Sequence, residues 1–231
     1  TDAVPVGINL VNTNRGVGAK PSTSDEILDD YARSAQRLAE HAAYLMVNLS
    51  CPNTEDGRDF FSSAERIDDL LSRLETGTGS TPVFLKVSPD WDLRSIDALV
   101  ETAARYDRVA GFMFNLSSKR REGLATPRSV WQDLPGAISG PPTKAWMNNR
   151  VGQLYQRIDH RRFKIISAGG ISSAEDAYHT IRQGASLVQV YTGLVYEGPG
   201  LVRKINRGLV RLIERDGLST IEDAVGIDST K

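Results

Sequence analysis

The sequence is poor in cysteine, with a single one among 231 residues. One thiol cannot form an internal disulfide, which excludes the small secreted domains that disulfides hold together and favours a reducing compartment. No apolar run approaches the ~20 residues that a helix needs to cross a bilayer. No charged-then-apolar leader precedes the first apolar run, and that run begins within a few residues of Thr1. The abrupt start predicts a fragment boundary.

An excess of either charge is also lacking, because 28 basic residues stand against 29 acidic ones and the net charge is -1. This balance gives no reason to expect nucleic acid as a partner. The 3 histidines show no ligand spacing, so no metal site is predicted. The basic pair Arg161 and Arg162 is interpreted as surface before a strand.

What the sequence does contain is a repeated strand-then-helix pattern. Short runs with two apolar faces indicate buried parallel strands, expected at residues 4–10, 43–49, 83–87, 111–115, 164–168 and 186–191. Amphipathic stretches of helical length alternate with them, at residues 25–40, 64–74, 93–106, 144–158, 173–183 and 200–216. A last helical stretch is expected at 219–224. Ser24 is the predicted N-cap of the first helix, and Gly184 follows the fifth as a stop.

This alternation predicts an α/β fold with a parallel sheet and right-handed crossovers. A doubly wound sheet and a (β/α)₈ TIM barrel both fit the pattern. A barrel needs eight strands and ~250 residues, so six strands predict that the first two are missing from this chain. Since no linker divides the sequence, residues 1–231 are expected to form a single, N-terminally truncated β/α barrel domain. The long irregular stretch at 116–143 has the length of a functional loop.

Polar residues gather where the predicted strands end, which is where a parallel β/α fold places its chemistry. Buried amides and amines need hydrogen-bond partners. The residues concerned are Asn9, Asn48, Cys51, Asn53, Lys86 and Asn115, with glycine-bearing turns at residues 169–170 and 191–193. A planar polar ligand with several carbonyl and NH groups would satisfy this set.

Each of these residues also has a structural interpretation. Asn9 is able to bond its own loop, and Asn48 and Asn53 are able to form Asx-type turns. Cys51 also fits an inert buried thiol, which is the common fate of a lone cysteine. Lys86 fits an ion pair with a neighbouring carboxylate. From the residues alone, both interpretations stay open.

The Gly169 and Gly170 pair favours function more strongly. It fits a tight turn before a helix cap at Ser172 or Ser173. It also supplies the bare backbone NH groups at a helix N-terminus that a phosphate needs. The last two strands of a barrel are the usual phosphate site.

Five segments together resemble a known family. VNLSCPNT at residues 47–54 resembles the substrate-loop signature of dihydroorotate dehydrogenases, and ISAGGISSAEDA at 166–177 is similar to their phosphate-binding turn. GASLVQVYTGLVYEGP at 184–199 resembles the quinone-dependent, membrane-associated class in particular. VGINL at 6–10 and FLKVSPD at 84–90 match in the same order. The resemblance runs almost from end to end.

The resemblance implies an oxidoreductase of pyrimidine biosynthesis that uses FMN to oxidise dihydroorotate to orotate. Cys51 stands at the position of the catalytic base, which takes a proton from C5 while a hydride leaves C6 for the flavin. The implied substrate-binding residues are Asn48, Asn53, Asn115 and Ser117. The implied cofactor-binding residues are Asn9, Asn48, Lys86, Ser139, Gly140, Gly169, Gly170, Tyr191 and Thr192.

Three departures keep alternatives open. A cysteine base is typical of the soluble class of the family. Cys51 and the C-terminal motif therefore point to different classes. Leu116 replaces a hydroxyl residue of the family pattern, which motivates a related FMN oxidoreductase acting on another cyclic amide. The absent first strands motivate a truncated, non-catalytic homologue.

The electron acceptor and location follow from the same resemblance. The C-terminal motif favours quinone, while fumarate and an NAD-linked partner stay open. The expected location is cytoplasmic, with peripheral contact on the inner membrane through the absent N-terminal segment.

Overall fold

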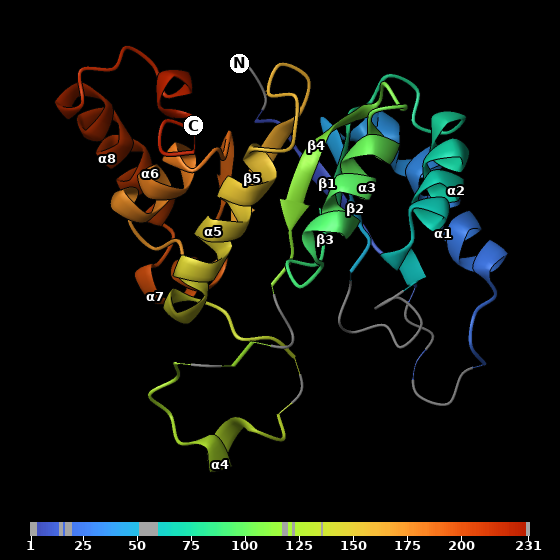
Figure 1. The fold of residues 1–231 in the computed structure, drawn as a ribbon, viewed down its shortest axis with the longest axis horizontal. Coiled ribbons are helices and arrows are strands. Elements are labelled where there is room, and N and C mark those ends of the chain that lie inside the picture. Colours follow the sequence, from blue (N-terminus) through green and yellow to red (C-terminus); the bar gives the residue numbers. More distant parts are fainter. Residues whose placement is uncertain are drawn as a thin grey trace. The chain divides into compact units, whose positions relative to one another are not determined.

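The computed structural model describes residues 4–13, 16, 20–50, 60–116, 120–121, 123–134 and 136–229. Two compact units divide the chain, Thr1–Phe112 and Met113–Lys231. Strands and helices alternate along both of them (Figure 1). The α/β pattern expected from the sequence is therefore present in each, whereas the expectation of a single domain stays a prediction.

The first unit holds three parallel strands and the helices that follow them. Its elements are β1 (Gly7–Leu10), α1 (Ser24–Leu38), η1 (Ala39–His41), β2 (Tyr44–Asn48), η2 (Phe60–Ser62), α2 (Ala64–Glu75), β3 (Val83–Val87) and α3 (Leu93–Ala103). The strand β4 (Val109–Phe114) begins in this unit. Each α-helix of this unit begins at a side-chain cap that accepts a backbone N–H: Thr23 for α1, Ser63 for α2 and Asp92 for α3.

The two faces of the β1–β2–β3 sheet differ in character. Register partners in a parallel sheet point to the same face, and Leu10, Val47 and Leu85 share one register row. Their exposed fractions are 3%, 0% and 0%. This face is thus the core face, and α1 and α2 lie on one side of the strands (Figure 1). The opposite face carries Asn48 and Lys86, which are also register partners.

The second unit contains the remaining elements. They are α4 (Arg128–Trp131), η3 (Pro141–Thr143), α5 (Lys144–Tyr155), β5 (Lys164–Ala168), α6 (Ala174–Arg182), β6 (Leu187–Gln189), α7 (Thr192–Glu197), α8 (Leu201–Arg215) and η4 (Glu222–Ala224). Strands β5 and β6 pair in parallel, with Ala168 opposite Gln189. Helices α6 and α8 pack closely, because a Cβ on Gly208 would lie 2.2 Å from the Cβ of Ala174.

The C-terminal segment is fastened to α5 and α6. The Arg182 guanidinium holds Asp228 through two bonds of 3.0 and 2.7 Å and Asp216 through one of 3.1 Å. The Gly226 N–H donates to the carbonyl of Ile181 at 3.1 Å. A Cβ on Gly226 would lie 2.1 Å from the Tyr155 ring. Only glycine therefore allows the tail to pass over this aromatic side chain.

Most predicted elements agree with the structure, but the predictions for the first and the last strand were wrong in part. Residues 83–87 and 164–168 form strands with the predicted bounds. The first predicted strand starts only at Gly7, and Val4 and Val6 are 84% and 60% exposed. Leu187 in β6 is 55% exposed. In the described residues β1 and β6 each pair with a single strand, so they are edge strands and not buried ones.

The predicted cap of α1 was also wrong by one residue. Thr23 is the N-cap, and Ser24 is the first helical residue. The Glu26 N–H donates to the Thr23 hydroxyl at 3.2 Å, and the Thr23 N–H donates to the Glu26 carboxylate at 2.8 Å. This reciprocal capping box needs an acidic or amide side chain three residues after the cap. Counted from Thr23 that residue is Glu26, whereas counted from Ser24 it is Ile27.

Replacing the cap tests this assignment. Thr23→Ala removes one half of the capping box and should lower the free energy of unfolding by about 1 kcal/mol. Ser24→Ala is the matched control, because an alanine at the first helical position removes no capping bond and should cost less than about 0.5 kcal/mol. Urea unfolding followed by circular dichroism measures both. A larger loss from Ser24→Ala than from Thr23→Ala would contradict the assignment.

Candidate functional site

In the first unit, the sheet face opposite the core carries polar residues at the strand ends, and apolar residues one step earlier along the same strands. Asn48 and Lys86 are register partners at the carboxyl ends of β2 and β3. One step earlier on the same face stand Met46 and Phe84, 6% and 8% exposed, with Asn9 of β1 beside Met46. The amide and the amine therefore sit at the strand ends, as predicted. Asn9 lies one step lower and is exposed.

Asn48 is held from two sides. It is 7% exposed. Its backbone carbonyl accepts a hydrogen bond from the Tyr31 hydroxyl at 2.5 Å, and its side-chain oxygen accepts from the Ser50 N–H at 3.3 Å. The second bond is the Asx-type turn of the structural interpretation, so this turn is present at Asn48. The Lys86 carbonyl accepts from the Leu49 N–H at 2.8 Å and fixes the neighbouring strand end.

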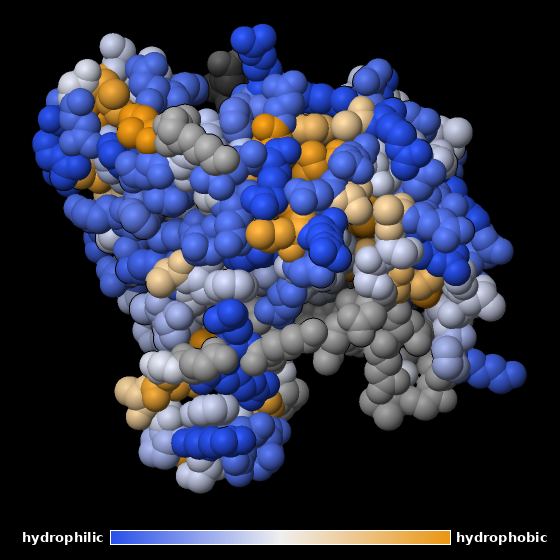
Figure 2. Space-filling view, in the orientation of Figure 1, coloured by the Kyte–Doolittle hydropathy of each residue, from blue (hydrophilic) through white to orange (hydrophobic). Residues whose placement is uncertain are grey.

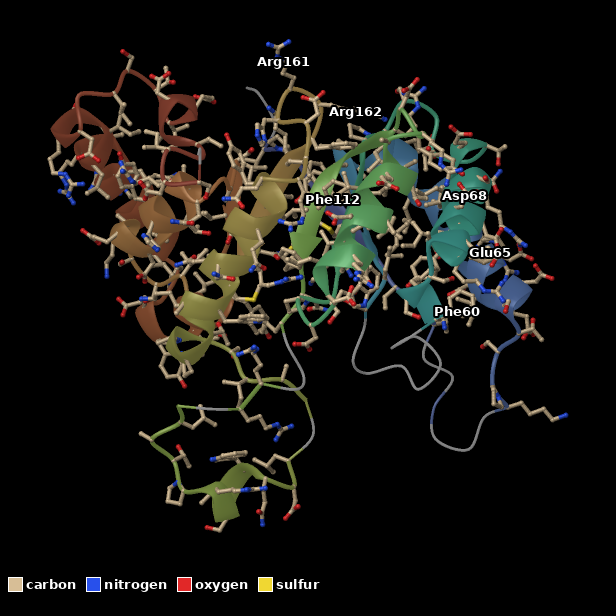
Figure 3. The ribbon with its side chains drawn as sticks, viewed as in Figure 1. Phe60, Glu65, Asp68, Phe112, Arg161 and Arg162 are labelled. Carbon is tan, nitrogen blue, oxygen red and sulfur yellow. The ribbon has the colours of Figure 1, made fainter. Side chains whose placement is uncertain are left out.

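Three of the predicted residues lie outside the described residues. They are Cys51 and Asn53, which follow β2, and Ser117, which follows β4. The segment that leads from Cys51 to α2 ends on a buried anchor. Phe61 is 1% exposed and packs edge-on against Tyr31, with ring centroids 5.7 Å apart. Phe60 precedes it (labelled in Figure 3).

In the second unit, Asn115 directly follows β4 and turns the chain. Its side-chain oxygen accepts from the Leu116 N–H at 3.0 Å. The Leu116 side chain lies near the predicted phosphate turn, because its Cδ2 is 3.3 Å from where a Cβ on Gly169 would be. Met147 Cγ approaches the same point to 2.8 Å. Leu116 therefore packs beside the glycine turn and Met147.

Three glycine-bearing turns of the second unit meet. A Cβ on Gly170 would lie 2.8 Å from the Cβ and 2.9 Å from the Cα of Lys144, the first residue of α5. A Cβ on Gly193 would lie 2.5 Å from the Ile171 carbonyl oxygen. The hydroxyl of Thr192 donates to that of Ser139 at 2.9 Å. These contacts bring residues 139–140, 169–172 and 192–193 together, as the family resemblance implied.

The backbone of these turns is specialised. Gly140, Gly169 and Gly170 have φ angles of +81°, +104° and +75°, a region that other residues rarely adopt. Two helices, α5 and α6, begin next to the turns. Helix N-termini carry unpaired N–H groups and a partial positive charge. The arrangement is suited to holding an anion. Tyr191, also predicted here, precedes α7 and is 82% exposed.

Asp176 joins the pieces of this turn cluster. Its carboxylate forms an ion pair with the Lys144 ammonium at the start of α5. It also accepts from the Ser172 N–H at 3.0 Å and from the Ser172 hydroxyl at 3.1 Å. Its own N–H donates to the Ser173 cap at 3.1 Å. One carboxylate thereby connects α5, the 169–172 turn and α6.

The charge state of Asp176 follows from these contacts. Burial raises the pKa of the Asp176 carboxyl, but the Lys144 ammonium and the Ser172 donors outweigh it, so the pKa lies below its usual value. The carboxylate is therefore ionised at neutral pH. Its negative charge is balanced locally by Lys144 and does not oppose an anion at the glycine turns.

Sequence reasoning missed both Asp176 and Lys144 as members of the site. Two signals were present in the sequence. Ser173 and Asp176 have the spacing of a capping box. Lys144 starts a helix, where the dipole disfavours a cation unless a carboxylate is near.

A metal centre and a membrane span find no support in the part of the chain that the structure describes. There, no three His, Cys, Asp or Glu side chains gather closely enough to bind a metal ion. Nor is any described helix long and apolar enough to cross a membrane. Arg161 is exposed in the loop before β5, as expected, whereas Arg162 is only partly exposed (Figure 3).

Known proteins resemble the chain over nearly all of its length. The sequence pattern of the dihydroorotate dehydrogenase family matches residues 5–213. A dihydroorotate dehydrogenase (quinone) of Natronomonas pharaonis is 37% identical over 225 residues, which are 97% of this chain and 60% of that protein. One of Thermobifida fusca is 38% identical over 232 residues, covering 96% of this chain and 58% of that protein. The chain thus spans about three fifths of these relatives.

Solved structures agree with the sequence relatives. A DHODH of Eimeria tenella in complex with ferulenol matches 91% of this chain with a TM-score of 0.80 and 26% identity. The ligand-free form matches 100% of the chain with a TM-score of 0.85 and 24% identity, and this chain covers 66% of it. The predicted α/β barrel fold class is confirmed by this match. By sequence pattern, relatives and fold, the chain belongs to the dihydroorotate dehydrogenase family.

Proposed function

We propose that this protein oxidises dihydroorotate to orotate with FMN as its redox cofactor and a quinone as electron acceptor. The observation that carries the proposal is the meeting of three glycine-bearing turns at the starts of α5 and α6, where Asp176 bonds both Lys144 and Ser172. This is the phosphate end of a flavin site. The polar row of Asn48 and Lys86 in the first unit supplies groups for a heterocycle.

The residues present fit the phosphate of FMN. Gly140, Gly169 and Gly170 leave no side chain between their N–H groups and a bound oxygen, and their positive φ angles are strained in any other residue. Ser139 and Thr192 add hydroxyls that face each other at 2.9 Å. Backbone N–H groups and hydroxyls at helix N-termini are a frequent phosphate-binding set. FMN would supply the acceptor of the hydride that leaves C6 of the substrate.

The chain's own residues have separate tasks in the reaction. Asn48, Asn53, Asn115 and Ser117 are proposed to bind the pyrimidine amides and carboxylate. Lys86, with Asn9 further down the same face, is proposed to contact the flavin. The Lys86 ammonium would place positive charge where negative charge develops during hydride transfer.

Cys51 is proposed to take the proton from C5, so that loss of this proton and of the C6 hydride leaves the double bond of orotate. A free thiol has a pKa of ~8.5, and only its thiolate is basic enough. Its surroundings must therefore favour the thiolate at neutral pH. Tyr31 and Phe61 support this role indirectly, because they anchor both ends of the segment that carries Cys51.

The purified protein tests this function directly. With FMN added, an absorbance band of bound flavin is expected, and anaerobic addition of dihydroorotate should bleach it. Binding of FMN without bleaching would favour an oxidoreductase for another cyclic amide. Failure to bind FMN would favour a non-catalytic homologue and contradict the proposal.

Substitution of Cys51 tests the base. Cys51→Ala should abolish bleaching at neutral pH while FMN stays bound, because no group then accepts the C5 proton. Cys51→Ser should retain some activity with a higher pH optimum, since an alcohol is harder to deprotonate than a thiol. Stopped-flow absorbance measures the reduction rate. An undiminished rate in Cys51→Ala would show that the base is another group.

Substitution of Asp176 tests the phosphate site without requiring catalysis. Asp176→Asn breaks the ion pair with Lys144 and should weaken FMN binding about tenfold, since charge-assisted hydrogen bonds contribute ~1.5–3 kcal/mol and this pair is partly exposed. Riboflavin lacks the phosphate, so its affinity should change less than about twofold. Flavin fluorescence quenching measures both dissociation constants.

The matched control is Glu175→Gln, which removes the same charge from the exposed neighbour of Asp176. It should leave both flavin affinities unchanged. The pKa of Asp176 lies below its usual value. FMN affinity should therefore stay constant as the pH falls to the range in which an ordinary Asp side chain, of pKa ~3.9, begins to protonate. Equal losses for FMN and riboflavin in Asp176→Asn would contradict the phosphate assignment.

A further inference from the structure

Gly169 is enclosed on the side where a side chain would stand. A Cβ at this position would lie 2.8 Å from Met147 Cγ, 3.2 Å from Thr143 Oγ1 and 3.3 Å from Leu116 Cδ2. These three side chains come from different segments, namely α5, η3 and the residues that follow β4. The path of the 169–170 turn is therefore set by packing from three directions, in addition to its glycine backbone.

Thr143 connects this enclosure to the second glycine turn. Its hydroxyl donates to the Gly140 carbonyl at 2.9 Å, and its backbone N–H donates to the same oxygen at 3.1 Å. Met147 is 1% exposed, so its neighbours leave it little freedom to move away. Leu116 is the one member of the three that does not belong to η3 or α5. It closes the enclosure from the end of β4.

Leu116 is constrained where the chain leaves β4, and its chemistry is apolar. Its N–H donates to the Asn115 side-chain oxygen at 3.0 Å, which fixes the backbone at this point. A leucine side chain has no donor or acceptor with which to bond a pyrimidine. Its described contact is with the glycine turn. The residue that replaces the family's hydroxyl therefore packs at the phosphate end of the site.

We propose that Leu116 is a positioning residue of the phosphate turn. With Met147 and Thr143 it keeps Gly169 and Gly170 where their N–H groups meet an anion, because a binding site keeps its geometry only if the residues behind it are packed. The departure at position 116 then acts on the retention of the cofactor and not on the choice of substrate. This inference rests on the proposed function, since it takes the phosphate of FMN as the anion.

Truncation of Leu116 tests the proposal. Leu116→Ala leaves a space beside Gly169 into which the turn is able to relax, and it should weaken FMN binding about tenfold. Riboflavin has no phosphate for the turn to hold, so its affinity should fall less than about twofold. Leu116→Met keeps an apolar side chain of similar volume and should stay within about threefold of the unchanged protein for FMN. Flavin fluorescence quenching measures these dissociation constants.

Leu116→Thr separates an effect on the cofactor from an effect on the substrate. It supplies the hydroxyl of the family pattern but shortens the side chain, so FMN should bind about fivefold more weakly. The dihydroorotate concentration that half-saturates anaerobic flavin reduction should change less than about twofold, because no substrate contact is lost. Tighter dihydroorotate binding with an unchanged FMN affinity would overturn the proposal, since Leu116 would then belong to the substrate wall.

Leu134→Ala is the matched control. Leu134 lies in the same long loop and is 56% exposed, and Figure 2 shows hydrophobic residues at the surface of the segment around α4, at its lower left. Removing an exposed side chain creates no internal space, so both flavin affinities should stay unchanged. In the flavin-free protein, Leu116→Ala should shift the amide resonances of Gly169 and Gly170, whereas Leu134→Ala should not. Circular dichroism checks that each variant is folded.

The unchanged protein separates failure of this inference from failure of the proposed function. If it binds FMN no more tightly than riboflavin, the phosphate assignment is wrong and the inference falls with it. If it prefers FMN and folded Leu116→Ala keeps the full preference, the inference alone is overturned. The same holds if Leu134→Ala loses as much FMN affinity as Leu116→Ala.

Discussion

The close approach of Gly170 to the start of α5 is the constraint on which the proposed site depends. Any side chain at that position would lie within 2.8–3.0 Å of Lys144 atoms, including its backbone. Because the turn passes this near, its N–H groups stand beside the N-termini of α5 and α6. Asp176 then holds the turn, since it bonds both Ser172 and Lys144. The packing of the turn and the proposed anion site thus both depend on one backbone contact.

The sequence predicted the buried strands well and the outer strands poorly, for a physical reason. The apolar side chains within residues 83–87 and 164–168 are nearly all buried, and the predicted bounds of both strands agree with the structure. Val4 and Val6 are also apolar, but their side chains are exposed. An apolar run indicates the capacity to be buried, and whether a neighbour covers it depends on contacts that local sequence does not contain.

The candidate site, like the strands, was predictable from the sequence only in part. The glycine turns were predictable, because Gly169 and Gly170 stand between a strand and a helix. The ion pair between Lys144 and Asp176 joins residues 32 positions apart, and no periodicity relates them. The cap at Thr23 was missed by one residue because two hydroxyl residues are adjacent, and only the distance to Glu26 separates them. Cys51 stays a prediction of family resemblance.

The central claim is that the glycine turns bind the phosphate of FMN, and backbone amide chemical shifts test it most directly. Spectra of the isotope-labelled protein are compared with FMN and with riboflavin, which differ only in the phosphate. The account predicts that the largest differences between the two spectra fall on the amides of Gly140, Gly169 and Gly170. Differences that spare these three amides and fall on other residues would contradict it.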